Sequence, residues 1–122
     1  VHEVGLVHGD LKPSNIFFDR QSGVQLIDFG FSGKAGTAVT GSTKGFRPPD
    51  APPALSPRLD IFQVGASLIW WLHPEIYQEQ WLERIARQIK EGWHAQLGDF
   101  LLACLGGRRI SQLKEHPFLQ QR

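Results

Sequence analysis

The sequence is short of several residue types, and each shortage excludes a class of protein. A single cysteine among 122 residues cannot form an internal disulfide, so nothing indicates an oxidising compartment. The 13 basic and 12 acidic residues leave a net charge of +1, which gives no electrostatic footprint for nucleic acid or a membrane surface. The longest nearly apolar run, Val64 to Leu72, is far too short to span a bilayer. We therefore expect a cytoplasmic protein without nucleic-acid or membrane partners.

Methionine is absent altogether, and a chain without an initiator methionine is either processed or a piece of a longer protein. His2, Glu3 and His8 make the first residues too polar for a secretory signal, so we expect none. The whole chain is 41% hydrophobic and 20% charged, which is the composition of one soluble globular domain and not of a disordered segment. The length is enough to bury a core.

The order of the predicted elements favours an α+β fold that is mostly α. Short β-prone runs at residues 16–18 and 24–27 flank a polar turn and predict a hairpin. Gly, Ser, Thr and Pro dominate residues 31–58, which predicts a long loop, and long loops in compact domains are usually functional or disordered. Helices follow at 59–72, 78–91 and 96–105, and Ser111 can cap a short last helix.

The first predicted helix is apolar nearly all round, which predicts a buried helix at the centre of the fold. Ser56 and Pro57 form a typical helix start, and His73 before a proline ends it. Cys104 lies on an apolar helix face and is expected to be inert. No histidine spacing indicates a zinc site. Four tryptophans are expected to be core and interface residues: Trp70, Trp71, Trp81 and Trp93.

Residues 8–15, which we name the polar loop, carry the chemistry. Within them Asp10, Lys12 and Asn15 supply a carboxylate, an ammonium group and a carboxamide. A second carboxylate, Asp28, follows the second strand of the hairpin, which can return the chain to Asn15. Two oxygen donors side by side suit Mg²⁺, and a lysine can neutralise a phosphoryl group. Asp10 is left to orient a hydroxyl and accept its proton, so the set has the parts that phosphoryl transfer needs.

These motifs resemble the C-terminal lobe of a eukaryotic-type protein kinase. The polar loop resembles its catalytic loop, and residues 28–30, Asp-Phe-Gly, resemble its metal-binding motif. Residues 42–50 are similar to the end of its activation segment, and residues 116–119 to the usual end of the domain. The motifs stand in the family's order and cover essentially the whole chain.

The resemblance implies a role for each matching residue. Asp10 would be the catalytic base, Lys12 would contact the γ-phosphate of ATP, and Thr43 would shape the substrate pocket. Asn15 and Asp28 would bind Mg²⁺. The structural supports would be His8 packed on Phe29, Asp60 anchoring the polar loop, and Asp50 paired with Arg108 or Arg109. The Lys-Pro pair in the polar loop implies serine and threonine of proteins as substrates.

The sequence departs from the kinase pattern at several points. Gly9 replaces an arginine that pairs with a phosphorylated activation loop in many kinases, which puts activation by loop phosphorylation in doubt. Asp50 replaces a glutamate and Pro48 an alanine. The Gly-rich loop, strand lysine and helix glutamate of the N-terminal lobe do not occur in the chain.

We therefore expect residues 1–122 to form a C-lobe fragment that is inactive alone, with an N-lobe expected upstream. Its parts would be the catalytic and metal-binding motifs (1–30), the activation segment and loop (31–58) and a helical subdomain (59–122).

Two alternatives stay open at this point. The divergent residues and the N-lobe motifs that do not occur also fit a pseudokinase-like or truncated scaffold module. A small-molecule kinase of the aminoglycoside or choline phosphotransferase type would share the His-Gly-Asp and Asp-Phe-Gly motifs. Lys12, residues 43–50 and residues 116–118 favour a protein kinase over the second alternative.

Overall fold

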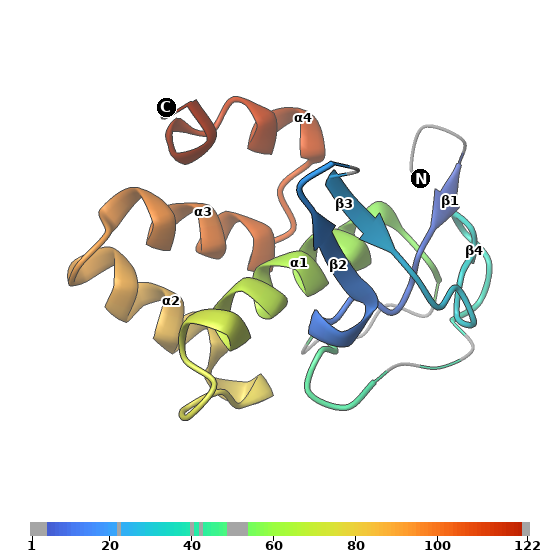
Figure 1. The fold of residues 1–122 in the computed structure, drawn as a ribbon, viewed down its shortest axis with the longest axis horizontal. Coiled ribbons are helices and arrows are strands. Elements are labelled where there is room, and N and C mark those ends of the chain that lie inside the picture. The colour runs from blue at the N-terminus through green and yellow to red at the C-terminus, as the bar shows by residue number, and fades with distance from the viewer. Residues whose placement is uncertain (1–4, 22, 40, 42, 49–53, 121–122) are drawn as a thin grey trace.

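The computed structural model describes residues 5–21, 23–39, 41, 43–48 and 54–120 (Figure 1). Short strands and turns make up the first part of the described chain, and helices make up the second. The strands are β1 (Leu6–Val7), β2 (Ile16–Asp19), β3 (Gly23–Leu26) and β4 (Gly33–Lys34), with the 3-10 turn η2 (Pro13–Asn15) before β2. The helices are α1 (Pro57–Leu72), α2 (Leu82–Glu91), α3 (Ala95–Leu105) and α4 (Ile110–Lys114), with the 3-10 turns η3 (Glu79–Trp81) and η4 (Pro117–Gln120). The predicted α+β fold, mostly α, is confirmed.

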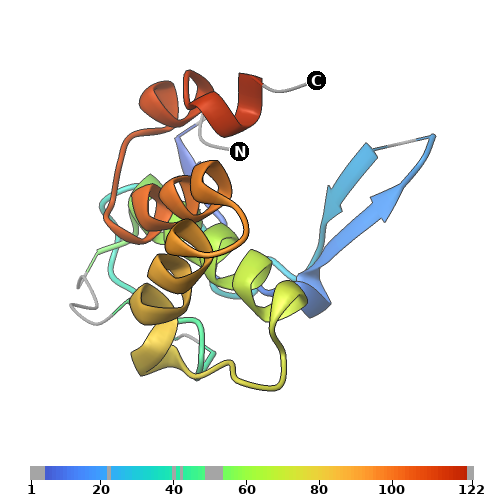
Figure 2. The ribbon, with the colours of Figure 1, turned by 90° about the vertical axis from the view of Figure 1, so that its left-hand side faces the viewer.

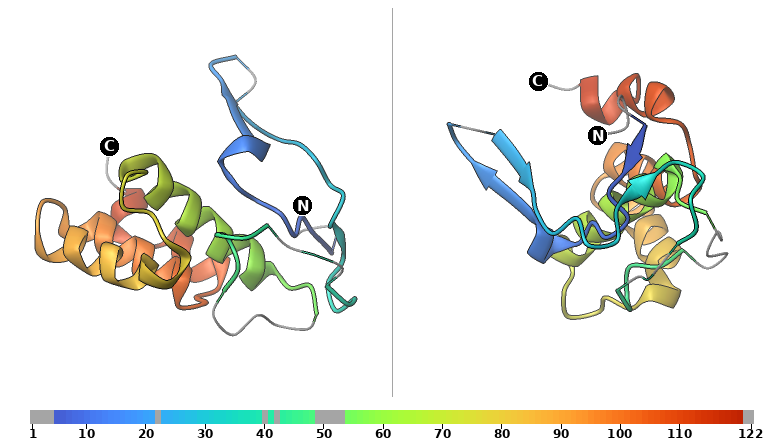
Figure 3. Two further views of the ribbon diagram at one scale, coloured as in Figure 1. Left: turned by 90° about the horizontal axis from the view of Figure 1, so that it is seen from below. Right: turned by 90° about the vertical axis from the view of Figure 1, so that its right-hand side faces the viewer.

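The predicted hairpin is present as β2 and β3, which pair antiparallel from Ile16 with Leu26 to Asp19 with Gly23. Figures 2 and 3 show that this hairpin projects from the helical part of the molecule as an arm. A second pair joins β1 to β4, with Val7 opposite Gly33. The sequence did not predict β4, because a strand of two residues in a Gly-rich loop leaves no periodic pattern.

Helix α1 crosses the middle of the molecule, between the strands and the pair α2 and α3 (Figure 1). It begins after the N-cap Ser56 and ends at the C-cap His73, as the sequence predicts. Its burial differs from the expectation, because Val64 is 37% exposed and polar Gln63 is fully buried. The buried polar face of α1 is turned to the polar loop, which supplies backbone groups for hydrogen bonding.

The main core lies where α1, α2 and α3 meet. It is built from apolar residues of all three helices, among them Phe62, Ile69, Ile85, Ile89 and Leu101. Helices α2 and α3 approach so closely that a Cβ on Gly98 would overlap the backbone of Lys90. This packing explains why two helices form in this part of the chain, as the sequence predicts. The predicted second helix, 78–91, is α-helical only from Leu82, and Glu79–Trp81 form the 3-10 turn η3 instead.

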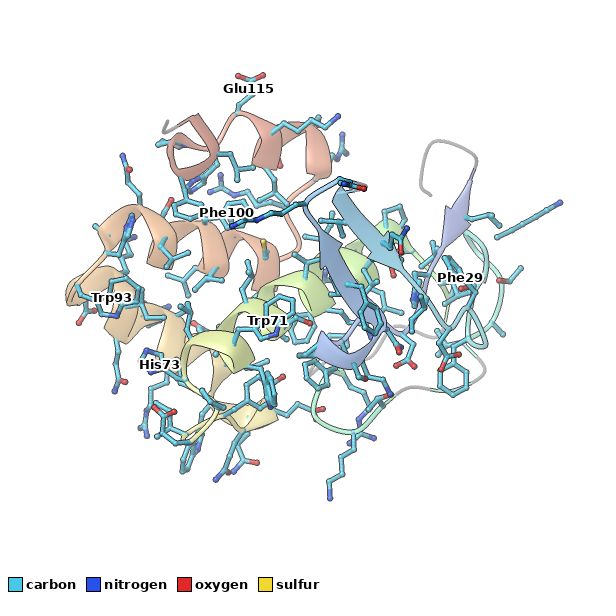
Figure 4. All side chains as sticks on the ribbon, viewed as in Figure 1. Phe29, Trp71, His73, Trp93, Phe100 and Glu115 are labelled. Carbon is cyan, nitrogen blue, oxygen red and sulfur yellow. The ribbon has the colours of Figure 1, made fainter. Side chains whose placement is uncertain are left out.

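Two expectations about the helical part are wrong. The last helix begins at Ile110 with Arg109 at its N-cap, where the Arg109 amide donates to Gln112 Oε1 at 3.2 Å, so Ser111 lies inside it and does not cap it. The four tryptophans are not buried in the core, so the part of that expectation that concerns the core is wrong. They are between 39% and 60% exposed. Trp70 and Trp71 lie in the last turn of α1. Figure 4 labels Trp71 there and Trp93 in the connection after α2.

No helix in the part of the chain that the structure describes is long and apolar enough to cross a membrane.

Candidate active site

The polar loop is held against α1 by side chains of that helix. The carboxylate of Asp60 accepts the backbone N–H groups of His8 and Gly9, both at 2.8 Å. One turn further along α1, Gln63 Oε1 accepts the Leu11 N–H at 2.7 Å. A buried loop needs a partner for each backbone donor, and α1 supplies three of them.

His8 supports the loop from the other side. Its ring accepts the Asp10 N–H at Nδ1 (3.1 Å) and lies 2.9 Å from the Ile27 carbonyl through Nε2. This pattern requires the proton on Nε2, because a carbonyl can only accept. The ring also packs on Phe29 at a centroid distance of 4.5 Å, and Ser32 Oγ donates to the His8 carbonyl at 2.6 Å. The structure thus brings together the two residues that we expected to pack.

Asp10 is the centre of a cluster of polar side chains. It is 4% exposed, and its Oδ1 accepts the Thr43 hydroxyl at 2.6 Å. Lys12 Nζ donates to the same Thr43 oxygen at 3.0 Å and lies 3.7 Å from Asp10 Oδ2. Asn15 Nδ2 donates to the Asp10 carbonyl at 2.9 Å, with a longer contact of 3.4 Å to Oδ2. Four of the predicted site residues therefore share one cluster.

Asp28 lies one residue beyond a contact between the hairpin and the polar loop. The Ile27 N–H donates to the Asn15 carbonyl at 3.0 Å, so Asp28 directly follows a residue bonded to the polar loop. Asp28 has a left-handed backbone (φ 58°), and its exposed carboxylate accepts the Gly30 N–H at 3.3 Å. Figure 4 shows Phe29 on the side of the molecule that carries β1.

The donor set at this point fits a magnesium ion. Asn15 uses its amide nitrogen on Asp10, which leaves Oδ1 as its oxygen donor, and Asp28 adds a carboxylate. Mg²⁺ is held in proteins by one or two such oxygen donors and keeps several waters. No group of three or more His, Cys, Asp or Glu side chains suited to a metal occurs within the described ranges.

The predicted pairing of Asp50 with an arginine lies outside the described residues, because Asp50 does. Both candidate partners, Arg108 and Arg109, are exposed. The backbone of Arg109 begins α4, as described above.

Sequence reasoning missed three residues that hold the segment after Thr43. Gln63 Nε2 donates to the Phe46 carbonyl at 3.2 Å. Glu79 Oε2 accepts the N–H groups of Gly45 and Arg47 at 2.7 and 3.0 Å, and Tyr77 donates its hydroxyl to the Gly45 carbonyl. Gln63 could have been found as a polar residue one turn after Asp60 in an apolar helix. Tyr77 lies just before the predicted helix 78–91 and Glu79 in its first turn, and neither position carries a signal of this contact.

Comparison with known proteins settles the family. The family model for the protein kinase domain matches residues 1–98. This chain belongs to the protein kinase family. The match covers the polar loop, the hairpin and Thr43, so the cluster around Asp10 lies inside the kinase domain.

Several curated kinases are similar to this one over part of their length. Human dual specificity mitogen-activated protein kinase kinase 7 is 36% identical over 76 residues, covering 53% of this chain and 18% of that protein. Protein kinase YpkA of Yersinia pestis is 33% identical over 95 residues, covering 70% and 13%. Mouse sperm motility kinase 2B is 31% identical over 103 residues, covering 75% and 20%. The chain described here therefore spans about a fifth or less of the length of these relatives.

The fold is also that of a solved kinase. The structure of the Cydia pomonella granulovirus kinase, PK-1, superposes with a TM-score of 0.71 at 20% identity, covering 98% of this chain and 53% of that chain. The arrangement of strands and helices described above is thus a kinase-like fold.

Gly9 is the departure from the kinase pattern that the structure explains. Its φ is +88°, a conformation that favours glycine, and a Cβ at this position would lie 2.5 Å from the Phe31 carbonyl oxygen. An arginine here would require the chain at Phe31 to move.

Proposed function

We propose that this chain carries the catalytic and metal-binding residues of an enzyme that transfers a phosphoryl group from ATP to serine and threonine hydroxyls of proteins. We further propose that an N-lobe preceding Val1 completes the ATP site. The observation that carries the proposal is the bond from the Thr43 hydroxyl to Asp10, with the Lys12 ammonium group on the same oxygen. A carboxylate and an ammonium group that already hold one hydroxyl form a suitable environment for an acceptor hydroxyl.

The contacts of Asp10 indicate which oxygen accepts the proton. Oδ1 is occupied by the short bond from Thr43, whereas Oδ2 has only the longer contacts to Asn15 and Lys12. Oδ2 is therefore the atom that would orient the acceptor hydroxyl and take its proton. The hydroxyl oxygen would bond to the γ-phosphorus while the bond from that phosphorus to the β,γ-bridging oxygen breaks and ADP leaves. Proton transfer of this kind contributes about 10²–10⁴-fold to a rate.

The other polar residues near Asp10 would neutralise the transferred phosphoryl group and hold the metal ion. Lys12 would offset the charge on the transferred group as a point cation. ATP supplies the phosphoryl group with Mg²⁺, and Asn15 Oδ1 and the Asp28 carboxylate would hold the metal ion. Asn15 also fixes the backbone at Asp10 through its amide nitrogen, so one side chain serves both parts of the site.

The segment after Thr43 supports a protein substrate over a small molecule. Residues 43–48 are held against the helices by Gln63, Tyr77 and Glu79, and this places a fixed stretch of chain beside Asp10. Such a stretch provides an ordered surface for a peptide next to the acceptor hydroxyl.

Asp10→Asn tests the proposal in the chain joined to its native upstream sequence. Transfer of labelled phosphate from ATP to a general protein substrate is expected to fall at least about 100-fold, because the amide cannot accept the proton. Phosphate in the product should be on serine and threonine. The 122 residues alone should show no turnover.

Glu83→Gln is the matched control, since Glu83 lies in an exposed ion pair with Arg87 on α2. It should keep full activity. An Asp10→Asn variant as active as this control would contradict the assignment of Asp10, and an inactive parent protein would favour the scaffold alternative.

A further inference from the structure

One buried side chain joins the two segments that meet at the candidate active site. Gln63 is fully buried in α1, and its carboxamide bonds to the polar loop and to the segment after Thr43. Oε1 accepts the Leu11 N–H at 2.7 Å, and Nε2 lies 3.4 Å from the Gly9 carbonyl and 3.2 Å from the Phe46 carbonyl. The amide has two N–H groups, so both of its donors and its acceptor are used.

These bonds are part of a closed hydrogen-bond network around Asp10. Gln63 Nε2 donates to the Phe46 carbonyl, and the Phe46 N–H donates to the Thr43 carbonyl at 3.2 Å. The Thr43 hydroxyl then donates to Asp10, whose neighbour Leu11 donates back to Gln63. A displacement of the Gln63 amide would move both Leu11 and Phe46, and with them the two ends of the Thr43–Asp10 bond.

The position of Gln63 distinguishes it from a general packing residue. Ser67, one turn further along α1, is also fully buried, but its hydroxyl has no hydrogen-bond partner among the described residues. The two side chains thus share a helix and full burial, and differ in their bonds to the site.

We propose that Gln63 is a positioning residue that sets the alignment of Thr43 with Asp10. The inference rests on the proposed function, in which Asp10 meets the acceptor hydroxyl beside Thr43. Gln63 touches neither substrate nor the reacting atoms, and it acts through the backbone of Leu11 and Phe46.

Gln63→Met tests this hydrogen-bond network in the 122-residue chain by NMR. Methionine keeps the length of the side chain and removes all three bonds. We expect the Thr43 hydroxyl proton, which a 2.6 Å bond to a carboxylate protects, to exchange at least about tenfold faster. The Leu11 amide should also exchange faster, whereas the His8 and Gly9 amides, bonded to Asp60, should change less.

Ser67→Ala is the matched control, and it should leave the Thr43 and Leu11 signals unchanged. Unchanged signals in a folded Gln63→Met variant would overturn the proposal. If that variant does not fold, Gln63→Glu replaces it. A carboxyl group still accepts from Leu11 but cannot donate to two carbonyls, so Leu11 should stay protected while the Thr43 signal changes. A Thr43 signal unchanged in Gln63→Glu would equally overturn the proposal.

An activity measurement separates this inference from the proposed function. In the chain joined to its native upstream sequence, Gln63→Met should lower kcat about 10–100-fold with the KM for ATP within about twofold. Equal kcat in parent and variant would overturn the inference. An inactive parent protein would overturn the proposed function instead, and the NMR result alone would then decide whether Gln63 aligns Thr43 with Asp10.

Discussion

At the scale of single residues, Asp60 anchors the polar loop with a charged group. It accepts two backbone N–H groups of the buried polar loop, from His8 and Gly9. A buried donor without a partner lowers the free energy of unfolding by about 1–3 kcal/mol. Hydrogen bonds to a carboxylate are stronger than bonds to a neutral acceptor, so their loss is more costly. Removal of this carboxylate should therefore destabilise the whole polar loop.

Asp60→Ala is expected to lower the free energy of unfolding by about 3 kcal/mol, since it leaves two buried donors unpaired. Urea denaturation followed by circular dichroism measures this loss. Glu83→Ala, which breaks an exposed ion pair on α2, should cost under about 0.5 kcal/mol. Equal midpoints for the two variants would show that Asp60 does not anchor the loop.

Cys104 shows how burial alone controls the chemistry of a residue. It is 1% exposed on α3, and burial raises the pKa of its thiol to about 12. The thiolate is the reactive form of cysteine, so the thiol stays protonated and unreactive at neutral pH. This agrees with the expectation that Cys104 is inert.

The residues of the site differ in how far the sequence predicts them. Asp10, Lys12 and Asn15 stand close together in the chain, and their side-chain chemistry is visible without a fold. Gln63 and Glu79 are far from the polar loop in sequence, and only tertiary packing brings them to the segment after Thr43. A polar residue one turn after Asp60 in an apolar helix marks Gln63 as unusual, but no local pattern identifies the partner of either residue.

At the scale of elements, the contact of α2 with α3 depends on one glycine. Gly98 lies against the backbone of Lys90, and a Cβ would overlap its N and Cα atoms. The neighbouring atoms belong to a helix backbone, which cannot give way as a flexible side chain can. The approach of these two helices is therefore fixed by the absence of a side chain.

Gly98→Ala should destabilise the protein by about 2 kcal/mol. Alanine has a helix propensity about 1 kcal/mol more favourable than glycine. Overpacking costs about 1–3 kcal/mol. The cost here lies at or above the upper end of that range, because the added Cβ meets main-chain atoms. Thermal unfolding of Gly98→Ala measures the balance. Gln96→Ala, at an exposed position of the same helix, is the control and should be neutral or slightly stabilising. A rise in Tm for Gly98→Ala would contradict the close packing.

The elements follow the sequence where the signals are local. Ser56 with Pro57, and His73 before a proline, fix the ends of α1, and Gly92 and Gly106 end α2 and α3. Of the buried polar residues of α1, Asp60 was predicted through the kinase resemblance, whereas Gln63 was not, because its partners Leu11 and Phe46 lie in other segments of the chain. The exposed tryptophans were mistaken for core residues, since composition does not show which face a helix buries.

At the scale of the whole molecule, Asp99 links three parts of the helical body. Its carboxylate lies 2.7 Å from His116 Nε2, just before η4, and 3.1 Å from Lys90 Nζ on α2. The hydrogen bonds from His116 and then from Lys90 hold the pKa of Asp99 below its usual range. A carboxyl group with a lowered pKa in the folded state stabilises the fold above its unfolded pKa and loses this effect as the pH falls.

Asp99→Asn should therefore be less stable than the parent at pH 7, and the difference should shrink as the pH falls from about 5 to 3. The side chain is 51% exposed, so solvent limits the effect to under about 1 kcal/mol. Urea titrations of both proteins at pH 7, 5 and 3 measure it. A difference that stays constant down to pH 3 would show that the ionised carboxylate makes no contribution.

The bonds from α1 to the polar loop also predict an order of folding. They join residues that are 51 to 54 positions apart, whereas α2 and α3 are neighbours in the chain. Closing a long loop costs more entropy than pairing adjacent helices, so local contacts form first. The helical body would thus assemble early, and the polar loop would dock late. Substitutions at Asp60 or Gln63 would then speed unfolding and leave the folding rate nearly unchanged.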